Sequence, residues 1–235
     1  MLDSPSVTMR AALLPFSLAL AACSGMPPDT LPSLERGQVV AGVNLAFDLA
    51  TPKSPDVAGW FGAGVGAGVD LAVGFDVPLG LMVGGPRTVG ALGSPRPPGL
   101  ALRKTWPNGV GVGVGSSTRI DFSAPDSLGP GTVSSAGPFV TVGPPPRAGD
   151  GGLGAGRVTA LLGYGWRDRA NEEGPRRGIV VQASGQVGGL VAHDDTVRVA
   201  VVARAQGGAF LFPRPAPLHG PALGLGVQSV QRPGL

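Results

Sequence analysis

Large apolar residues alternate with glycine and other small residues along most of this chain, and this period of two limits the possible folds more than any other feature. Between positions 61 and 77 every odd residue is apolar, whereas the even positions carry glycines followed by Asp70, Ala72, Gly74 and Asp76. Successive side chains of a β-strand point to opposite faces, so the pattern predicts β-structure. The run is long for one strand, so we expect a tight turn between Gly66 and Asp70.

The same alternation predicts strands over Val39–Leu49, Leu100–Trp106, Val110–Phe122, Val158–Trp166, Ile179–Val191, Val197–Leu211 and Leu223–Val227. Asn108 and Gly109 predict a hairpin, because Asn-Gly accepts the positive φ angles of a type I′ turn. The 41 glycines and 25 prolines among 235 residues disfavour helices. Segments rich in proline, glycine or charge are predicted to be loops, namely Thr51–Ala58, Arg87–Pro98, Ser123–Gly137, Pro144–Gly156 and Asp168–Gly178.

An alternating apolar face can point into the core of a soluble sandwich or outward from a membrane barrel into lipid. The second face of these strands consists mostly of small residues, and the only lysines are Lys53 and Lys104. Solvent-facing surfaces normally carry many lysines and glutamates, so this composition favours a narrow barrel lumen. The aromatic content of 5% counts against a membrane barrel, which carries aromatic girdles. We predict an all-β fold, an up-and-down antiparallel β-barrel of about eight to twelve strands.

The region from Arg10 to Gly25 is typical of a secretory signal peptide. A positive charge precedes an uncharged apolar run that ends in small residues, and the run is too short to span a bilayer. The tetrapeptide Leu20-Ala21-Ala22-Cys23 resembles the lipobox of bacterial lipoproteins, in which cleavage precedes a cysteine that is then acylated. The resemblance implies a signal peptide over residues 1–22 and lipid attachment at Cys23. We assign residues 23–35 to a flexible linker and, from the alternating strands, residues 36–230 to a barrel domain.

A lipobox followed by glycine-rich alternating strands resembles the small outer-membrane β-barrel lipoproteins of proteobacteria. The segment Gly68–Gly74 is similar to the turn-Asp-strand pattern that these barrels repeat. This resemblance covers most of the mature chain and transfers no functional residue. Ser24 follows the cysteine where an aspartate would retain a lipoprotein at the inner membrane. The resemblance therefore implies the outer membrane of a Gram-negative bacterium.

Motifs for catalysis or cofactor binding are weak in this sequence. Gly149–Gly154 matches G-x-G-x-x-G, but it lacks the strand before and the helix after that dinucleotide binding requires. His193–Asp195 has residue types that bind cations, yet hairpin turns use the same types. His193 and His219 share no metal-ligand spacing, and no G-x-S-x-G motif occurs. We predict no catalytic, cofactor-binding or metal-binding residue and no cofactor.

Charged residues are few and scattered. The net charge is +3, and the basic residues form no clustered stripe of the kind that nucleic-acid binding requires. We therefore predict no nucleic-acid partner. Three aspartates share one strand face and are expected to face three arginines across the lumen. The aspartates are Asp48, Asp70 and Asp76, and the arginines are Arg119, Arg198 and Arg204. The predicted partner is membrane lipid, through acylated Cys23 and through the barrel wall; a protein partner stays unknown.

These features together predict a lipid-anchored outer-membrane barrel with a structural or interaction role and no enzymatic activity. The first alternative is a lipid-tethered soluble barrel or sandwich that binds a small hydrophobic ligand. The second is a lipid-modifying barrel enzyme. Its candidate catalytic residue is His193, which lies beside a predicted turn, and this alternative ranks last.

Overall fold

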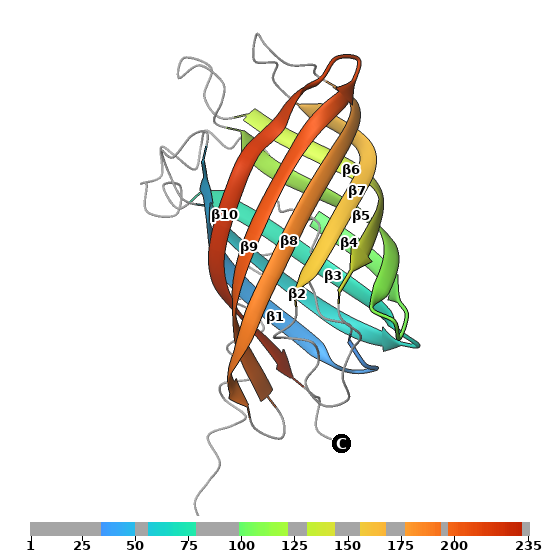
Figure 1. The fold of residues 1–235 in the computed structure, drawn as a ribbon, viewed down its shortest axis with the longest axis vertical. Helices are drawn as coiled ribbons and strands as arrows, with labels where there is room; N and C mark the ends of the chain where they lie inside the picture. Colours follow the sequence, from blue (N-terminus) through green and yellow to red (C-terminus); the bar gives the residue numbers. More distant parts are fainter. Residues whose placement is uncertain are drawn as a thin grey trace, which may run out of the picture.

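Ten antiparallel strands close into one barrel in the computed structural model, which describes residues 34–49, 56–78, 99–121, 131–143, 156–167, 177–193 and 197–231 (Figure 1). Each strand pairs with its neighbours in sequence, and β1 pairs with β10 to complete the ring. The predicted all-β, up-and-down barrel is therefore confirmed. The strands are β1 Val39–Asp48, β2 Asp56–Gly66, β3 Val69–Pro78, β4 Gly99–Thr105, β5 Val110–Asp121, β6 Gly131–Val142, β7 Arg157–Arg167, β8 Arg177–His193, β9 Val197–Phe212 and β10 Ala216–Gln231.

The tight turn predicted inside the long alternating run joins β2 to β3. Gly66 and Gly68 have φ angles of 121° and 74°, and Ala67 between them has a φ of 53°. Glycine adopts positive φ without a steric cost, so the glycines on either side of Ala67 help the chain to reverse here. The N–H of Thr105 donates to the C=O of Gly68 at 2.8 Å, which ties this turn to the end of β4.

The hairpin predicted at Asn108 and Gly109 joins β4 to β5, but its turn is not type I′. Among the described residues, Gly109 has a positive φ of 84°, whereas Asn108 does not. The N–H of Trp106 donates to the C=O of Val110, and the N–H of Gly109 donates to the C=O of Trp106. Trp106 and Val110 thus close a loop of residues 107–109, the pattern of a type I turn followed by a left-handed glycine. Pro107 favours it, because its φ is fixed near the value that a type I turn requires.

The strand β6 was not predicted, and the predicted loop Ser123–Gly137 is wrong from Gly131 onward. The outward positions of β6 include Ala136 and Pro138, so the large apolar residues that mark other strands are missing there. Pro138 pairs with β5, whereas the ladder between β6 and β7 has no pair at residues 137 and 138. Proline has no N–H to donate, so one side of the strand loses its hydrogen bond at this point.

Other strand boundaries also differ from the prediction. β10 is much longer than the predicted segment Leu223–Val227. The prediction missed its first half because prolines and a glycine interrupt the alternation there. The predicted loops Thr51–Ala58 and Asp168–Gly178 end early, since β2 begins at Asp56 and β8 begins at Arg177.

The two ends of the barrel differ in the length of their connections. We call the end where β1 begins and β10 finishes the terminal end, and the opposite end the loop end. The terminal-end connections are residues 67–68, 106–109, 143–156 and 194–196, and the loop-end connections are residues 49–55, 79–98, 122–130, 168–176 and 213–215. Three of the four terminal-end connections have two to four residues, whereas four of the five loop-end connections have seven or more. Among the described residues, no helix is long and apolar enough to cross a membrane.

Candidate functional site: the barrel wall and its polar interior

The outward face of the barrel, which we call the outer wall, is apolar. In β7 the outward residues Val158 and Leu162 are 61% and 55% exposed, whereas Thr159 and Leu161 between them are buried. The same alternation runs along the other strands. Exposed large apolar residues include Val43, Leu45, Phe61, Leu71, Leu100, Leu102, Val112, Val114, Val140, Ile179, Val187, Val201, Leu223, Leu225 and Val227. The outer wall is therefore a continuous apolar surface around the barrel.

Most of the exposed aromatic residues lie near the ends of the strands, whereas Phe61 lies in the middle of β2. Trp106 adjoins the β4–β5 turn at the terminal end. At the loop end, Tyr164 and Trp166 approach each other with ring centroids 6.5 Å apart, and Phe47 and Phe212 are also exposed there. Aromatic residues favour the two interfaces of a membrane, where one side of the ring is apolar and the other is wet. Their placement is the one expected of girdles that border an apolar wall.

The interior of the barrel is polar. Its buried polar and charged side chains include Asn44, Asp70, Arg103, Thr105, Ser117, Ser135, Thr141, Arg157, Thr159, Arg167, Gln182, Ser184, Gln186, Arg204 and Gln228. The buried apolar side chains form separate clusters between them, one around Trp60 and another around Phe210. The polarity of this protein is thus inverted relative to a soluble domain, which buries its apolar face.

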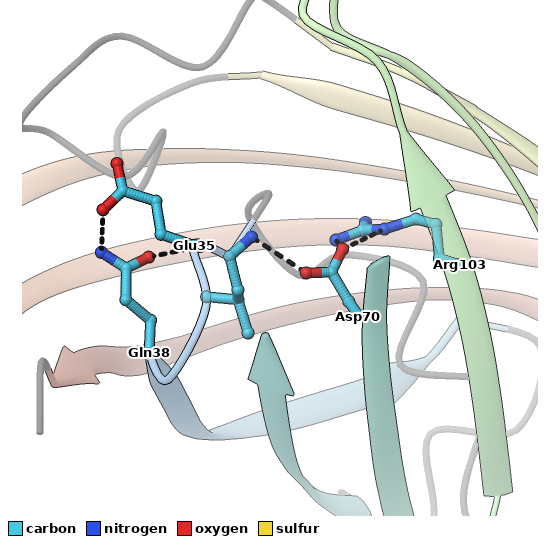
Figure 2. Close-up of polar contacts among 5 residues, drawn as sticks. Glu35, Gln38, Asp70 and Arg103 are labelled. Atoms are coloured by element: carbon cyan, nitrogen blue, oxygen red, sulfur yellow. Dashed lines mark hydrogen bonds and ion pairs between the residues drawn. The ribbon is translucent and has the colours of Figure 1, made fainter. Parts of the chain in front are cut away.

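Asp70 and Arg103 form an ion pair inside the barrel near the terminal end (Figure 2). The Asp70 Oδ2 atom accepts hydrogen bonds from Arg103 Nε at 3.0 Å and Nη2 at 2.8 Å. The Asp70 Oδ1 atom accepts a third hydrogen bond, at 3.0 Å, from the N–H of Leu34. Adjacent strands supply the pair, because Asp70 and Arg103 are register partners of β3 and β4. Buried charges persist in proteins when they are paired and hydrogen-bonded in this way.

The residues before β1, Leu34–Gln38, form what we call the entry segment, and they lie against the inside of the terminal end. The Leu34 side chain is buried in the cluster around Trp60. The N–H of Gly37 donates to the C=O of Gly64, and the N–H of Gly64 donates to the C=O of Gln38, both at 2.9 Å. A Cβ on Gly64 would lie 2.0 Å from the Glu35 carbonyl oxygen, so only glycine leaves room for this segment.

The entry segment also has its own internal hydrogen bonds (Figure 2). The N–H of Glu35 donates to Gln38 Oε1 at 2.8 Å, and Gln38 Nε2 donates to Glu35 Oε2 at 3.4 Å. The N–H of Gln38 donates to the C=O of Glu35. Leu34 and Glu35 fall inside the linker predicted over residues 23–35, but both lie against the barrel.

Side-chain hydrogen bonds connect strands across the interior. The Ser135 hydroxyl lies 2.8 Å from that of Ser117 on β5 and donates to Gln182 Oε1 on β8 at 3.3 Å. Near the loop end, Arg167 Nη2 donates to the C=O of Leu218, and the guanidinium lies 5.2 Å from the Phe210 ring centroid. These contacts hold long polar side chains in fixed positions within the lumen.

The acidic and basic residues predicted to meet in the lumen do not all do so. Asp70 is inside the barrel, but its side chain bonds to Arg103 and to the entry segment, not to the predicted arginines. Arg204 is buried in β9, and Arg198 is half-buried at the start of the same strand. Asp48, Asp76 and Arg119 lie in β1, β3 and β5. Cys23 and Gly149–Gly154 lie outside the described residues.

Sequence reasoning missed three buried arginines, Arg103, Arg157 and Arg167. Alternation was the available signal for Arg103, because it shares the parity of Ala101 and Thr105 rather than that of Leu100 and Leu102. His193 ends β8 in register with Arg198, and Asp194 and Asp195 lie outside the described residues. Among the described residues, no group of three or more histidines, cysteines or carboxylates is placed to hold a metal ion.

No protein-family model and no curated protein sequence matches this chain. Among solved structures, the chain is similar to the N-terminal β-barrel domain of OprF from Pseudomonas aeruginosa, with 12% identity, a TM-score of 0.33, and coverage of 83% of this chain and 98% of that one. It is also similar to neisserial surface protein A, with 10% identity, a TM-score of 0.37, and coverage of 83% and 94%. A third similar structure is a designed transmembrane β-barrel, with 10% identity, a TM-score of 0.29, and coverage of 84% and 98%.

Proposed function

We propose that this chain is an integral β-barrel protein of a bacterial outer membrane, tethered additionally by acyl chains on Cys23, with a structural or interaction role and no catalysis. The observation that carries the proposal is the inverted polarity of the barrel. Residues such as Val158 and Leu225, each 61% exposed, point outward, whereas Gln228 and Asp70, 1% and 2% exposed, point inward.

An apolar outer wall suits lipid and not water. Soluble monomers rarely expose a continuous apolar surface of this extent, because each exposed apolar side chain favours transfer out of water. A closed barrel leaves no unpaired sheet edge, which is the condition for β-structure to cross a bilayer. The strands β1 to β3 and β5 to β7, at 10 to 12 residues, are long enough to span it with the usual tilt.

The unequal connections support an orientation in that membrane. Outer-membrane barrels have short turns on the periplasmic side and longer loops outside the cell. By this rule the terminal end faces the periplasm and the loop end faces outward. The proposed acyl chains at Cys23, which precedes the entry segment, then belong to the periplasmic leaflet.

The polar interior counts against the alternative of a soluble barrel that binds a hydrophobic ligand. Such a barrel would line its lumen with apolar side chains. Here, within the described chain, Asn44 Oδ1, Thr141 Oγ1 and Arg157 Nη1 are buried without a hydrogen-bond partner in the protein. Buried groups of this kind are suited to internal water and not to a hydrocarbon ligand.

Carbonate extraction of the Cys23→Ala variant tests membrane embedding separately from lipid tethering. We expect the variant to stay in the membrane pellet and to change its gel mobility on boiling, because the barrel wall alone holds it in the bilayer. A Ser24→Ala variant, which keeps the cysteine, is the matched control. Release of the Cys23→Ala protein into the carbonate supernatant as a folded monomer would overturn the proposal.

The lipid tether has its own test. Radiolabelled palmitate should be incorporated into the wild-type chain and into Ser24→Ala, but not into Cys23→Ala, because the thiol of Cys23 is the proposed acylation site. Equal labelling of the cysteine-free variant would show that Cys23 is not the attachment site, and it would leave the barrel proposal untouched.

A further inference from the structure

A groove of about 740 Å³, which we call the wall groove, runs over the outer surface of the barrel from β3 to β8. Most of its lining belongs to the outer wall, including Leu102, Val114, Pro138, Ala160 and Val181. Its volume lies within the range of about 300–1,000 Å³ that is typical of small-molecule sites. The outer wall is therefore hollowed over these strands.

The groove is deep where the outward side chains of β6 and β7 are small. Pro138 and Ala160 are small outward residues on neighbouring strands, whereas Val140 and Leu162 beside them are larger and half exposed. Behind the floor, a Cβ on Gly137 would lie 2.4 Å from the Cα of Gly163, so the backbones of β6 and β7 approach closely. Small side chains between taller ones produce a channel in the wall.

Lys104 lies at the terminal-end side of the groove and points to the outer wall. It is the register partner of Val69 in β3 and of Val112 in β5, and both neighbours line the groove. Its Nζ atom contacts the carbonyl oxygen of Ala67 in the β2–β3 turn. An ammonium group has three N–H donors, so this contact leaves donors for an acceptor outside the protein.

A second cation lies beside the same turn. The side chain of Arg36 is in van der Waals range of Gly66, with its carbons 3.5 Å from the position of a Cβ there. The Lys104 Nζ atom is 3.5 Å from the corresponding position at Gly68. Arg36 and Lys104 therefore both approach the β2–β3 turn, and Lys104 also lines the apolar groove.

We propose that the wall groove binds one anionic phospholipid, with an acyl chain along the groove and the phosphate on Lys104. This inference rests on the proposed membrane function. A lysine on a lipid-facing wall is unfavourable at the bilayer centre but is tolerated near an interface, where its head reaches phosphate. The terminal end supplies that interface, and positive charge beside an apolar channel matches the two halves of such a lipid.

Native mass spectrometry of the folded barrel in non-ionic detergent tests the proposal, with phosphatidylglycerol and phosphatidylcholine of identical acyl chains offered in equal amounts. We expect about a fivefold preference for the anionic lipid, the effect of one basic residue near such a headgroup. Lys104→Gln should reduce the preference to near one, and Lys104→Arg should retain it. Arg214→Gln is the matched control, because it removes an exposed cation from the β9–β10 turn at the loop end.

The variant Ala160→Phe fills the groove and leaves every charge in place, so it should lower binding of both lipids. Full binding and full preference in this variant would overturn the groove, since surface charge alone would then explain the effect. A preference that survives Lys104→Gln, or that Arg214→Gln abolishes equally, would also overturn the proposal. Displacement of the lipid by excess inorganic phosphate would show that the acyl chain contributes nothing, with the same consequence.

The two proposals fail in different ways. A chain that is washed from membranes and shows no heat-dependent mobility contradicts the membrane function itself. A chain that passes both tests but binds the two lipids equally contradicts only the lipid site.

Discussion

Arg103 Nη2 lies 2.8 Å from Asp70 Oδ2 inside the barrel, and the two side chains are 3% and 2% exposed. The same carboxylate accepts the N–H of Leu34, so one aspartate joins β3, β4 and the entry segment. Removing one charge of a buried pair leaves the other without compensation.

Asp70→Asn should therefore destabilise the barrel by about 3–5 kcal/mol, the usual effect of breaking a buried ion pair. The midpoint of urea unfolding in lipid vesicles, followed by gel mobility, measures it. The double variant Asp70→Asn/Arg103→Gln should be less unstable than the two single changes predict together, because it leaves no isolated charge. Strict additivity would mean that the pair contributes no coupling energy.

Gly64→Ala should displace the entry segment. Its Cβ would lie 2.9 Å from the Leu34 Cβ and closer still to the Glu35 backbone, so the segment must move. We expect cleavage near residues 34–38 by added protease and a loss of about 1–3 kcal/mol, as for overpacked sites. Gly189→Ala is the control, because a Cβ there has no described atom within 4 Å. Equal protease resistance of the two variants would contradict the packing of this segment.

Leu225→Arg tests the outer wall. Leu225 points outward near the middle of β10 and pairs with Leu45 and Ala203. At the bilayer midplane an arginine on the lipid face should cost about 2–4 kcal/mol of folding stability in vesicles. Ser229→Arg is placed outward on the same strand near the terminal end, where the cost should fall to about 0–1 kcal/mol. A harmless Leu225→Arg would indicate that water faces this wall.

Ser135→Ala removes the hydroxyl that lies between Ser117 and Gln182. Both partners are buried, so we expect a loss of about 1–3 kcal/mol, the cost of leaving buried polar groups unsatisfied. Ser229→Ala, at an outward and partly exposed position, should change the unfolding midpoint little. If the two variants unfold at the same urea concentration, the contacts of Ser135 do not stabilise the barrel.

Most of the barrel could be predicted because strand periodicity is a local property of the sequence. The β2–β3 turn was located correctly because glycines and alternation coincide around Gly66 and Gly68. The strand β6 was missed because Ala136 and Pro138 take outward positions that larger apolar residues fill elsewhere. On a lipid-facing wall, small outward residues are acceptable where neighbouring strands carry large apolar side chains. Whether such neighbours are present depends on tertiary contacts and not on the local sequence.

The interior contacts were harder to predict, because they depend on strand register and not on strand identity. Alternation alone places Asp70 and Arg103 on the inner face. Their pairing requires the alignment of β3 with β4 across the connection 79–98, which no local pattern determines. Only Leu34 and Glu35 of the entry segment fell inside the predicted linker, and the rest was assigned to the barrel domain. The position of the entry segment follows from the space left by Gly64, a relation between segments that are distant in sequence.

The burial of Leu34 sets the reach of the proposed anchor. Ten residues separate Cys23 from Leu34, and a fully extended chain gains at most about 3.6 Å per residue. An acylated Cys23 must then lie within roughly 40 Å of the barrel mouth. A segment of this length cannot cross the periplasm to a second membrane. The acyl chains and the barrel would therefore diffuse together in a single bilayer.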